Sequence, residues 1–326
     1  MNKPPVEYFG VFDVARASKS GLPTAKPTYK NMVRILSNIG FVCKDEIYSR
    51  DVWAANIAAR VLYGGKYRTW RKNYFRLSTP YKTILRQKFS TTLPTFLGWE
   101  LSPGMKRFFD ENHLSYIDVS LSRIRFANDL LIDLSTNSTI LAQEISRRVV
   151  CVSNTELTRI AQATIMDKTE HDTLIVVGQV AGDASLLTPN GQEMTLRDFD
   201  DQIRSLALQY QRVLYRPHPK GASDVDQYFR DIPRDPEPSI YTHMARGASF
   251  CAISSSTLEE AAVFGCPVFR LADRTFAELH GDPFVTRNVH VLRSADYMGQ
   301  ISASGEVPIL RFVLGHNASD LGPLRN

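Results

Sequence analysis

Three polar loops between residues 174 and 271 carry the side chains of this sequence that are best suited to chemistry. Each loop follows an apolar run of strand type; the loops are Gly178–Ser185, Arg216–Lys220 and Ser254–Thr257. In an open α/β sheet, ligands bind in the crevice beyond the carboxyl ends of the strands. We therefore expect the three loops to converge on one binding site.

The first loop holds a carboxylate on a turn of small residues. Gly178 and Gly182 let the backbone approach a ligand closely, and Gln179, Asp183 and Ser185 are polar members of the loop. A carboxylate in a crevice can act as a nucleophile, a base or a stabiliser of an oxocarbenium ion. The alternative is an Asx turn, in which Asp183 only caps its own backbone.

The second loop reads Arg216-Pro217-His218-Pro219-Lys220. The two prolines fix the backbone on both sides of His218 and keep the loop out of a helix. A rigid histidine beside a lysine at a strand end is suited to holding a phosphate, so we prefer this role to a purely structural one.

The third loop combines hydroxyl side chains with the start of a helix. Ser254, Ser255 and Ser256 come first, and Ser256 with Glu259 has the spacing of a capping box. The free N–H groups and the dipole of a helix N-terminus favour phosphate binding. The alternative is that these serines only cap the helix. Glu260, one turn into the helix, could reach a ribose hydroxyl or could be a solvated acid.

The elements that position these loops alternate between strand and helix. In the first half we expect strands at 6–14, 41–43, 93–97 and 116–119, with helices at 28–39, 52–62 and from Ser102-Pro103. Trp99, Glu100, Arg123 and Arg125 lie at or beyond strand ends of this half, so we expect them to line the acceptor side of the crevice.

The second half repeats the alternation. We expect strands at 173–177, 212–215, 249–253, 268–271 and 289–292, all in one sheet, and a helix at 198–210. A mostly helical stretch, 140–165, and the charged segment 167–172 separate the halves. The pattern predicts an α/β chain with one domain at 1–168 and another at 169–302. Residues 303–326 would form a C-terminal tail, and the sequence leaves open whether this tail crosses back to the first domain.

The charge of the chain is unevenly distributed. Residues 1–150 hold 23 Lys and Arg against 12 Asp and Glu, whereas the remainder holds 16 and 22. Residues 60–88 contain nine basic side chains, no acid and interleaved aromatics. This segment could be a solvated surface, a surface for anionic lipid headgroups or glycans, or a nucleic-acid surface. No RRM, KH or helix-turn-helix pattern accompanies it, so we expect no nucleic acid partner.

The sequence also indicates a compartment. We find no apolar run long enough to span a membrane and no signal peptide, and we expect a cytoplasmic protein. A peripheral contact with the cytoplasmic face of the inner membrane stays open. Cys43, Cys151, Cys251 and Cys266 have no metal-ligand spacing, and we interpret them as buried free thiols.

The three loops together resemble those of a known family. Val176-Val177-Gly178-Gln179-Val180-x-x-Asp183-Ala184-Ser185, Arg-Pro-His-Pro-Lys and Ser-x4-Glu-Ala resemble the capsule β-Kdo transferases of the KpsC type and the β-Kdo transferase domain of the O-antigen enzyme WbbB. The resemblance implies a GT-B fold, in which two Rossmann-like domains hold the active site in the cleft between them. The sequence departs from the KpsC type in two ways. It has Ala262-Val263-Phe264-Gly265 where that type often has a Leu-Leu-Arg-Gly run, and it has one catalytic unit rather than two.

The resemblance also implies an activity and roles. The donor would be CMP-Kdo, transferred with retention to a glycan or lipid-linked glycan of capsule or lipopolysaccharide, without a metal or other cofactor. Asp183 would be the nucleophile, His218 and Lys220 would bind the phosphate and carboxylate of the donor, and Ser255 and Glu260 would bind its phosphate and ribose. Glu100 could be the base for the acceptor hydroxyl.

Two other functions remain open from the sequence. A CDP-polyol phosphotransferase of the teichoic-acid polymerase kind also combines a His-Pro loop with a serine-rich helix start, but it needs a base rather than a nucleophilic aspartate. A non-catalytic anion- or RNA-binding protein would use the basic segment 60–88.

Overall fold

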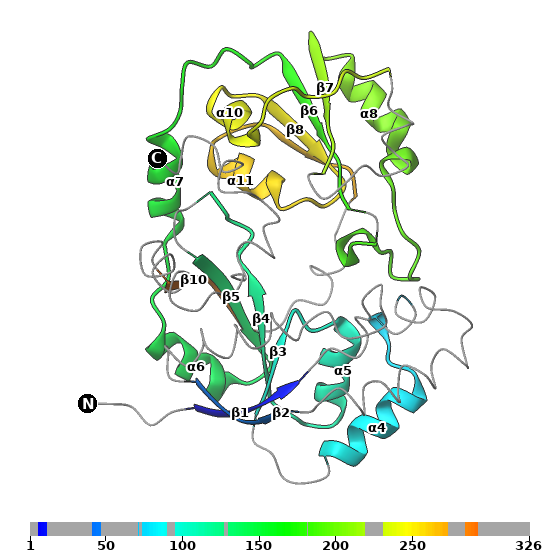
Figure 1. Cartoon of the computed structure of the whole chain (residues 1–326), viewed down its shortest axis with the longest axis vertical. Helices are drawn as coiled ribbons and strands as arrows, with labels where there is room; N and C mark the ends of the chain where they lie inside the picture. The colour runs from blue at the N-terminus through cyan, green and yellow to red at the C-terminus, as the bar shows by residue number, and fades with distance from the viewer. Residues whose placement is uncertain are drawn as a thin grey trace, which may run out of the picture.

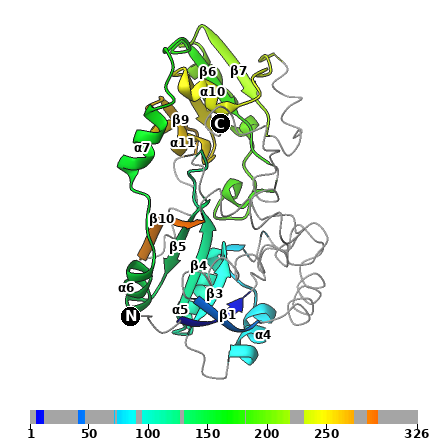
Figure 2. The ribbon, with the colours of Figure 1, turned by 60° about the vertical axis from the view of Figure 1, so that its left-hand side comes forward.

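The computed structural model describes residues 6–11, 41–46, 71, 74–89, 95–126, 130–180, 182–218, 231–272 and 284–292. It contains two β-sheets, which lie toward opposite ends of the long axis of the molecule (Figures 1 and 2). The chain is thus of the α/β class, with most of its strands parallel.

The six-stranded sheet has the order β10-β5-β4-β3-β1-β2. Its parallel strands are β1 (Val6–Val11), β2 (Phe41–Glu46), β3 (Phe96–Trp99) and β4 (Tyr116–Leu121). On the other edge β5 (Leu130–Thr136) is antiparallel to β4, and β10 (Phe284–Leu292) is antiparallel to β5. Helices α4 (Thr79–Phe89), α5 (Pro103–Glu111) and α6 (Thr139–Arg148) belong to this part of the chain.

Helix α5 shows how local sequence builds this half. Ser102 caps the helix, since its hydroxyl accepts a hydrogen bond from the backbone N–H of Met105 at 3.3 Å, and Pro103 fills the first helical position. The apolar face of the helix is buried against the sheet, and the ring of Phe109 stacks on Phe96 of β3 with centroids 5.2 Å apart. The predicted start of this helix is confirmed.

The four-stranded sheet is wholly parallel and has the order β7-β6-β8-β9. Its strands are β6 (Thr173–Val177), β7 (Arg212–Arg216), β8 (Ser249–Ala252) and β9 (Val268–Arg270). Every residue of β6 and β8 is buried, as expected of strands covered on both faces. Helices α8 (Asp200–Ala207), α10 (Ile240–Ala245) and α11 (Thr257–Val263) connect the strands, with short 3-10 turns η1 (Ala184–Leu186) and η2 (Leu196–Phe199).

The parallel strands of the two sheets share one order. Counted along the chain, both sheets place the second strand beside the first and the third strand on the other side of the first, followed by the fourth. The order reverses between β6 and β8 in one sheet and between β1 and β3 in the other. Such reversal points are where open α/β sheets bind ligands.

One strand was missed, and another was assigned to the wrong sheet. The strand β5 was not predicted, and the strand predicted at 289–292 does not extend the second sheet, because β10 pairs with β5 of the first. The stretch 140–165 is helical as expected but forms two helices, α6 and α7 (Asn154–Gln162). The helices predicted at 28–39 and 52–62 and the tail 303–326 lie outside the described residues, and the domain boundaries remain predictions.

The thiols differ in part from the expectation. Cys251 and Cys266 are buried and free, whereas Cys151 is exposed, so its predicted burial is wrong. It lies between α6 and α7, where the chain runs along the surface. Within the described residues, no helix has the length and hydropathy needed to cross a membrane.

Candidate functional site

The reversal point of the four-stranded sheet joins two of the three predicted loops. The side-chain amide of Gln179, just beyond β6, donates to the hydroxyl of Ser254 at 3.1 Å and accepts from the backbone N–H of Ser254 at 3.0 Å. The Ser254 hydroxyl in turn donates to the carbonyl oxygen of Ser185 at 3.0 Å. These bonds bring the loop after β6 to the loop after β8, as expected.

The loop after β7 is held at the same edge. The backbone N–H of Gly178 donates to the carbonyl oxygen of Arg216 at 2.8 Å. A Cβ atom on Gly178 would lie 2.7 Å from the hydroxyl oxygen of Tyr215, which is closer than side chains tolerate. Any larger residue at position 178 would therefore require Tyr215 to shift.

Arg216 uses its guanidinium within the protein. It forms an ion pair with Asp235 and donates to the carbonyl oxygens of Glu237 at 2.8 Å and Pro238 at 3.0 Å. Its predicted contact with a donor phosphate remains a prediction. His218 lies two residues further on and is half-buried, while Lys220 lies outside the described residues.

A buried charge network that sequence reasoning missed lies behind Arg216. The two ring nitrogens of His243 face the carboxylates of Asp235, at 2.9 Å, and Glu170. Burial alone would lower the pKa of His243, but the hydrogen bonds to both carboxylates outweigh it and raise the pKa. Burial would likewise raise the pKa of Asp235, yet its hydrogen bonds with His243, the Glu237 backbone and Arg216 lower it to about 2.

Asp183 is exposed and sits at the start of η1. Its Oδ1 atom accepts a hydrogen bond from the backbone N–H of Ser185 at 2.9 Å. This is the Asx-type turn that the sequence left open, and the bond fixes the orientation of the carboxylate. Its role as a nucleophile remains a prediction.

The basic, aromatic segment contacts the loop that carries Asp183. Glu193 forms an ion pair with Arg71 and also accepts from the backbone N–H of Gly182. Phe75 packs with Leu187 in a small apolar cluster. The described part of the segment is therefore in part a packing surface rather than a solvated face; residues 60–70 lie outside the described residues.

The start of α11 differs from the predicted capping box. Ser256 has helical backbone angles (φ −58°, ψ −22°) and its side chain makes no capping bond. Instead the hydroxyl of Ser255 accepts from the backbone N–H of Thr257 at 3.2 Å. The capping-box prediction is wrong because an N-cap side chain reaches the helix only from an extended backbone.

Glu260 of α11 joins the two halves of the chain. Its side chain is buried, and its Oε1 accepts from the backbone N–H of Arg125 at 2.7 Å and from the hydroxyl of Tyr241 at 3.1 Å. Burial raises its pKa to about 7, against the lowering effect of Arg125 and these hydrogen bonds. Beside it, Arg123 and Glu259 form an ion pair.

The contacts of Glu259 and Glu260 place the loop beyond β4 against the helix beyond β8. At this junction, the edge at which the parallel strands of one sheet end therefore meets the corresponding edge of the other sheet. Here the Nε atom of Arg125 is buried and has no hydrogen-bond partner among the described residues. A buried donor without a partner calls for an explanation, and a bound anion is one.

Glu100 marks the reversal point of the six-stranded sheet. It follows β3 with φ 47°, in the left-handed region that costs a non-glycine residue about 1–2 kcal/mol. A side chain on Gly98 would overlap Leu101, so the turn that contains Trp99 and Glu100 is tight. Backbone outliers of this kind gather at functional sites, which keeps the predicted role of Glu100 open to test.

The described residues contain no group of three or more His, Cys, Asp or Glu side chains able to hold a metal ion. No protein-family description matches the chain, and no curated protein sequence matches it. Among solved structures it is similar to "Thermosulfurimonas dismutans KpsC, beta Kdo 2,7 transferase", with 14% sequence identity and a TM-score of 0.43. That similarity covers 92% of this chain and 100% of the other and is a distant one.

Proposed function

We propose that this chain is a glycosyltransferase that moves a β-Kdo residue from CMP-Kdo to a glycan acceptor of a bacterial surface polysaccharide. The observation that carries the proposal is the junction of the two sheets. There the linked loops of Gln179 and Ser254, the buried Glu260 and the unsatisfied Nε of Arg125 occur on neighbouring segments. An anionic sugar nucleotide has the groups that such a junction could bind.

The donor would bind at the edge of the four-stranded sheet. Ser255 keeps a hydroxyl donor after accepting from Thr257, and His218 and Lys220 would neutralise the phosphate of the CMP leaving group. Because α11 has only seven residues, we assign phosphate binding to these side chains rather than to the helix dipole. Arg125 would bind the carboxylate of Kdo, which is a sugar acid.

The transfer would take place between the two edges. Asp183 would attack the anomeric carbon and displace CMP, forming a glycosyl ester, and the acceptor hydroxyl would then displace Asp183 with overall retention. Glu100, from the reversal point of the other sheet, would take the proton of the acceptor hydroxyl. The bond between Ser185 N–H and Asp183 Oδ1 would hold the carboxylate in one orientation.

Calorimetric titration with CMP tests the donor site. We expect Gln179→Ala and His218→Ala each to weaken CMP binding, by roughly 1–3 kcal/mol for the lost hydrogen bonds. The control is Arg147→Gln, which removes a charge from an exposed position on α6. Unchanged affinity in both site variants would refute the assignment of the donor site.

The Asx turn at Asp183 is the observation that favours a second candidate, the CDP-polyol phosphotransferase. That reaction needs no nucleophilic aspartate, so Asp183 could be only a turn residue. A thermal-shift panel of CMP, CDP, UDP and GDP separates the candidates: a selective shift with CMP supports the Kdo transferase, and one with CDP supports the phosphotransferase.

A further inference from the structure

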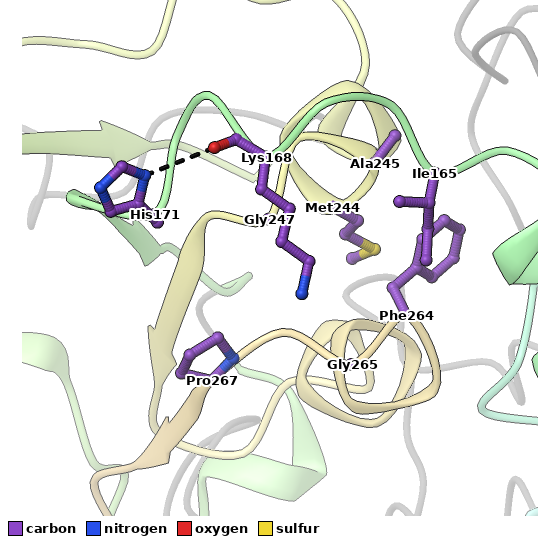
Figure 3. Close-up of a pocket in the computed structure, with 9 residues that line it drawn as sticks. All are labelled: Ile165, Lys168, His171, Met244, Ala245, Gly247, Phe264, Gly265 and Pro267. Carbon is purple, nitrogen blue, oxygen red and sulfur yellow. Dashed lines mark hydrogen bonds between the residues drawn. The ribbon is translucent and has the colours of Figure 1, made fainter.

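A cavity of about 180 Å³ lies at the edge of the four-stranded sheet that is opposite the candidate site (Figure 3). Its walls come from the segments that precede β6, β8 and β9 and from the ends of α10 and α11. The lining residues are Ile165, Lys168, His171, Met244, Ala245, Gly247, Phe264, Gly265 and Pro267. Since the predicted donor loops follow the carboxyl ends of the same strands, the cavity is separate from them.

The side chain of Lys168 extends across this cavity (Figure 3). Its aliphatic stem lies over Gly247, where an added Cβ would be 3.2 Å from Lys168 Cγ. Gly247 also has φ +79°, a conformation that disfavours any other residue. The glycine thus makes the room in which the lysine stem packs, and this directs the ammonium group into the cavity.

The neighbouring hydrogen-bonding groups are already used. The carbonyl oxygen of Met244 accepts from the backbone N–H of Gly247 at 3.2 Å and from the thiol of Cys266 at 3.3 Å. The carbonyl oxygen of Ala245 accepts from the backbone N–H of Met166 at 2.9 Å. In the described part of the chain, no ion pair or hydrogen bond uses the Lys168 ammonium, and none of the nine lining residues is acidic. An ammonium can only donate, so a ligand here must supply an acceptor, best a charged one.

Apart from Lys168 and the exposed His171, the side chains that line the cavity are apolar. Met244 and Phe264 are buried and form its floor, while Ile165 remains 37% exposed at its rim. A dry cavity of about 150 Å³ holds benzene, so this one has room for a single ring with a small substituent. Size, charge and lining together define one class of ligand.

We propose that this cavity binds a small amphipathic carboxylate of about the size of benzoate. The carboxylate pairs with the Lys168 ammonium, and the apolar part lies against Ile165, Met244 and Phe264. The proposal is independent of the proposed transferase activity, because the two sites lie at opposite edges of the sheet.

Titration of the full chain with 4-fluorobenzoate, followed by ¹⁹F NMR, tests this site. We expect saturable binding that Lys168→Gln weakens at least tenfold, and at least tenfold weaker binding of neutral 4-fluorobenzyl alcohol to the unchanged protein. Lys168 is exposed, so the variant should fold normally, which circular dichroism checks. Arg147→Gln removes a positive charge elsewhere and should leave the affinity within twofold.

Other results would overturn the proposal. It fails if 4-fluorobenzoate shows no saturable binding, or if Lys168→Gln binds it as tightly as the unchanged protein. It also fails if His218→Ala abolishes binding while Lys168→Gln does not, because the probe would then occupy the candidate donor site.

Discussion

At the scale of single residues, Glu260 departs furthest from the expectation of a solvated helix acid. It is buried and links the loop beyond β4 to α11, and burial raises its pKa from 4.5 to about 7. Between these two values the folded protein binds more protons at this site than the unfolded chain does. The stability contribution of Glu260 is therefore lost as the pH rises through about 7.

Glu260→Gln should remove this pH dependence, because the amide oxygen can still accept from Arg125 and Tyr241 without carrying a charge. Relative to the unchanged protein, its free energy of unfolding should rise by roughly 2.5 kcal/mol between pH 5 and pH 8. Urea denaturation at the two pH values measures this difference. Asp167→Asn, at an exposed position, is the control, and a difference that does not change with pH would contradict the assignment.

His243 gives a pH dependence of the same sign as Glu260, but its stabilising form is the charged one. Its two hydrogen bonds to carboxylates raise its pKa above 6.5, so it stabilises the fold fully below pH 6.5 and loses this effect as the pH rises through the raised value. His243→Gln leaves Asp235 and Glu170 without their shared cation and should lower the free energy of unfolding at pH 6 by roughly 3–5 kcal/mol.

Denaturation at pH 6 and pH 9 tests the prediction for His243, and the loss should be smaller at pH 9. The control is His171→Gln, since that side chain is 69% exposed and should change stability by less than about 0.5 kcal/mol. A loss at pH 6 no larger than that of the control would show that the network does not stabilise the fold.

At the scale of elements, the contact between β6 and β7 depends on Gly178. Gly178→Ala would push its methyl group against the hydroxyl of Tyr215 and should cost roughly 1–3 kcal/mol of stability. Tyr215→Phe removes that hydroxyl, so the double variant should recover part of the loss. Thermal unfolding of the two single variants and the double variant measures the coupling. Additive effects would mean that this close approach does not constrain the strands.

The elements also show what the sequence could predict. Strands such as β6, and the capped start of α5, follow from short local patterns of β-branched, serine and proline residues, and their predictions are confirmed. The partner of β10 could not be predicted, because a strand pattern does not specify the sheet it joins. The capping box failed because the spacing of Ser256 and Glu259 does not fix the backbone angles at Ser256.

At the scale of the whole molecule, the candidate site depends on contacts between distant segments. The sequence correctly predicted that the loops of Gln179 and Ser254 meet, because parallel strands end at one edge. It did not predict the network of Glu170 and His243, which are 73 positions apart and carry no shared local pattern. The unsatisfied Nε of Arg125 likewise arises only where the two sheets meet.

The central claim is that this junction transfers Kdo through Asp183. Peptide mass spectrometry after incubation with CMP-Kdo tests it most directly, compared between the unchanged protein and Asp183→Asn, which should fold normally because Asp183 is exposed. We predict one added Kdo on the peptide that contains Asp183, with no adduct and a loss of nearly all CMP release in Asp183→Asn. An unmodified peptide, together with CMP release by Asp183→Asn within about tenfold of the unchanged protein, some 1.4 kcal/mol of barrier, would contradict it.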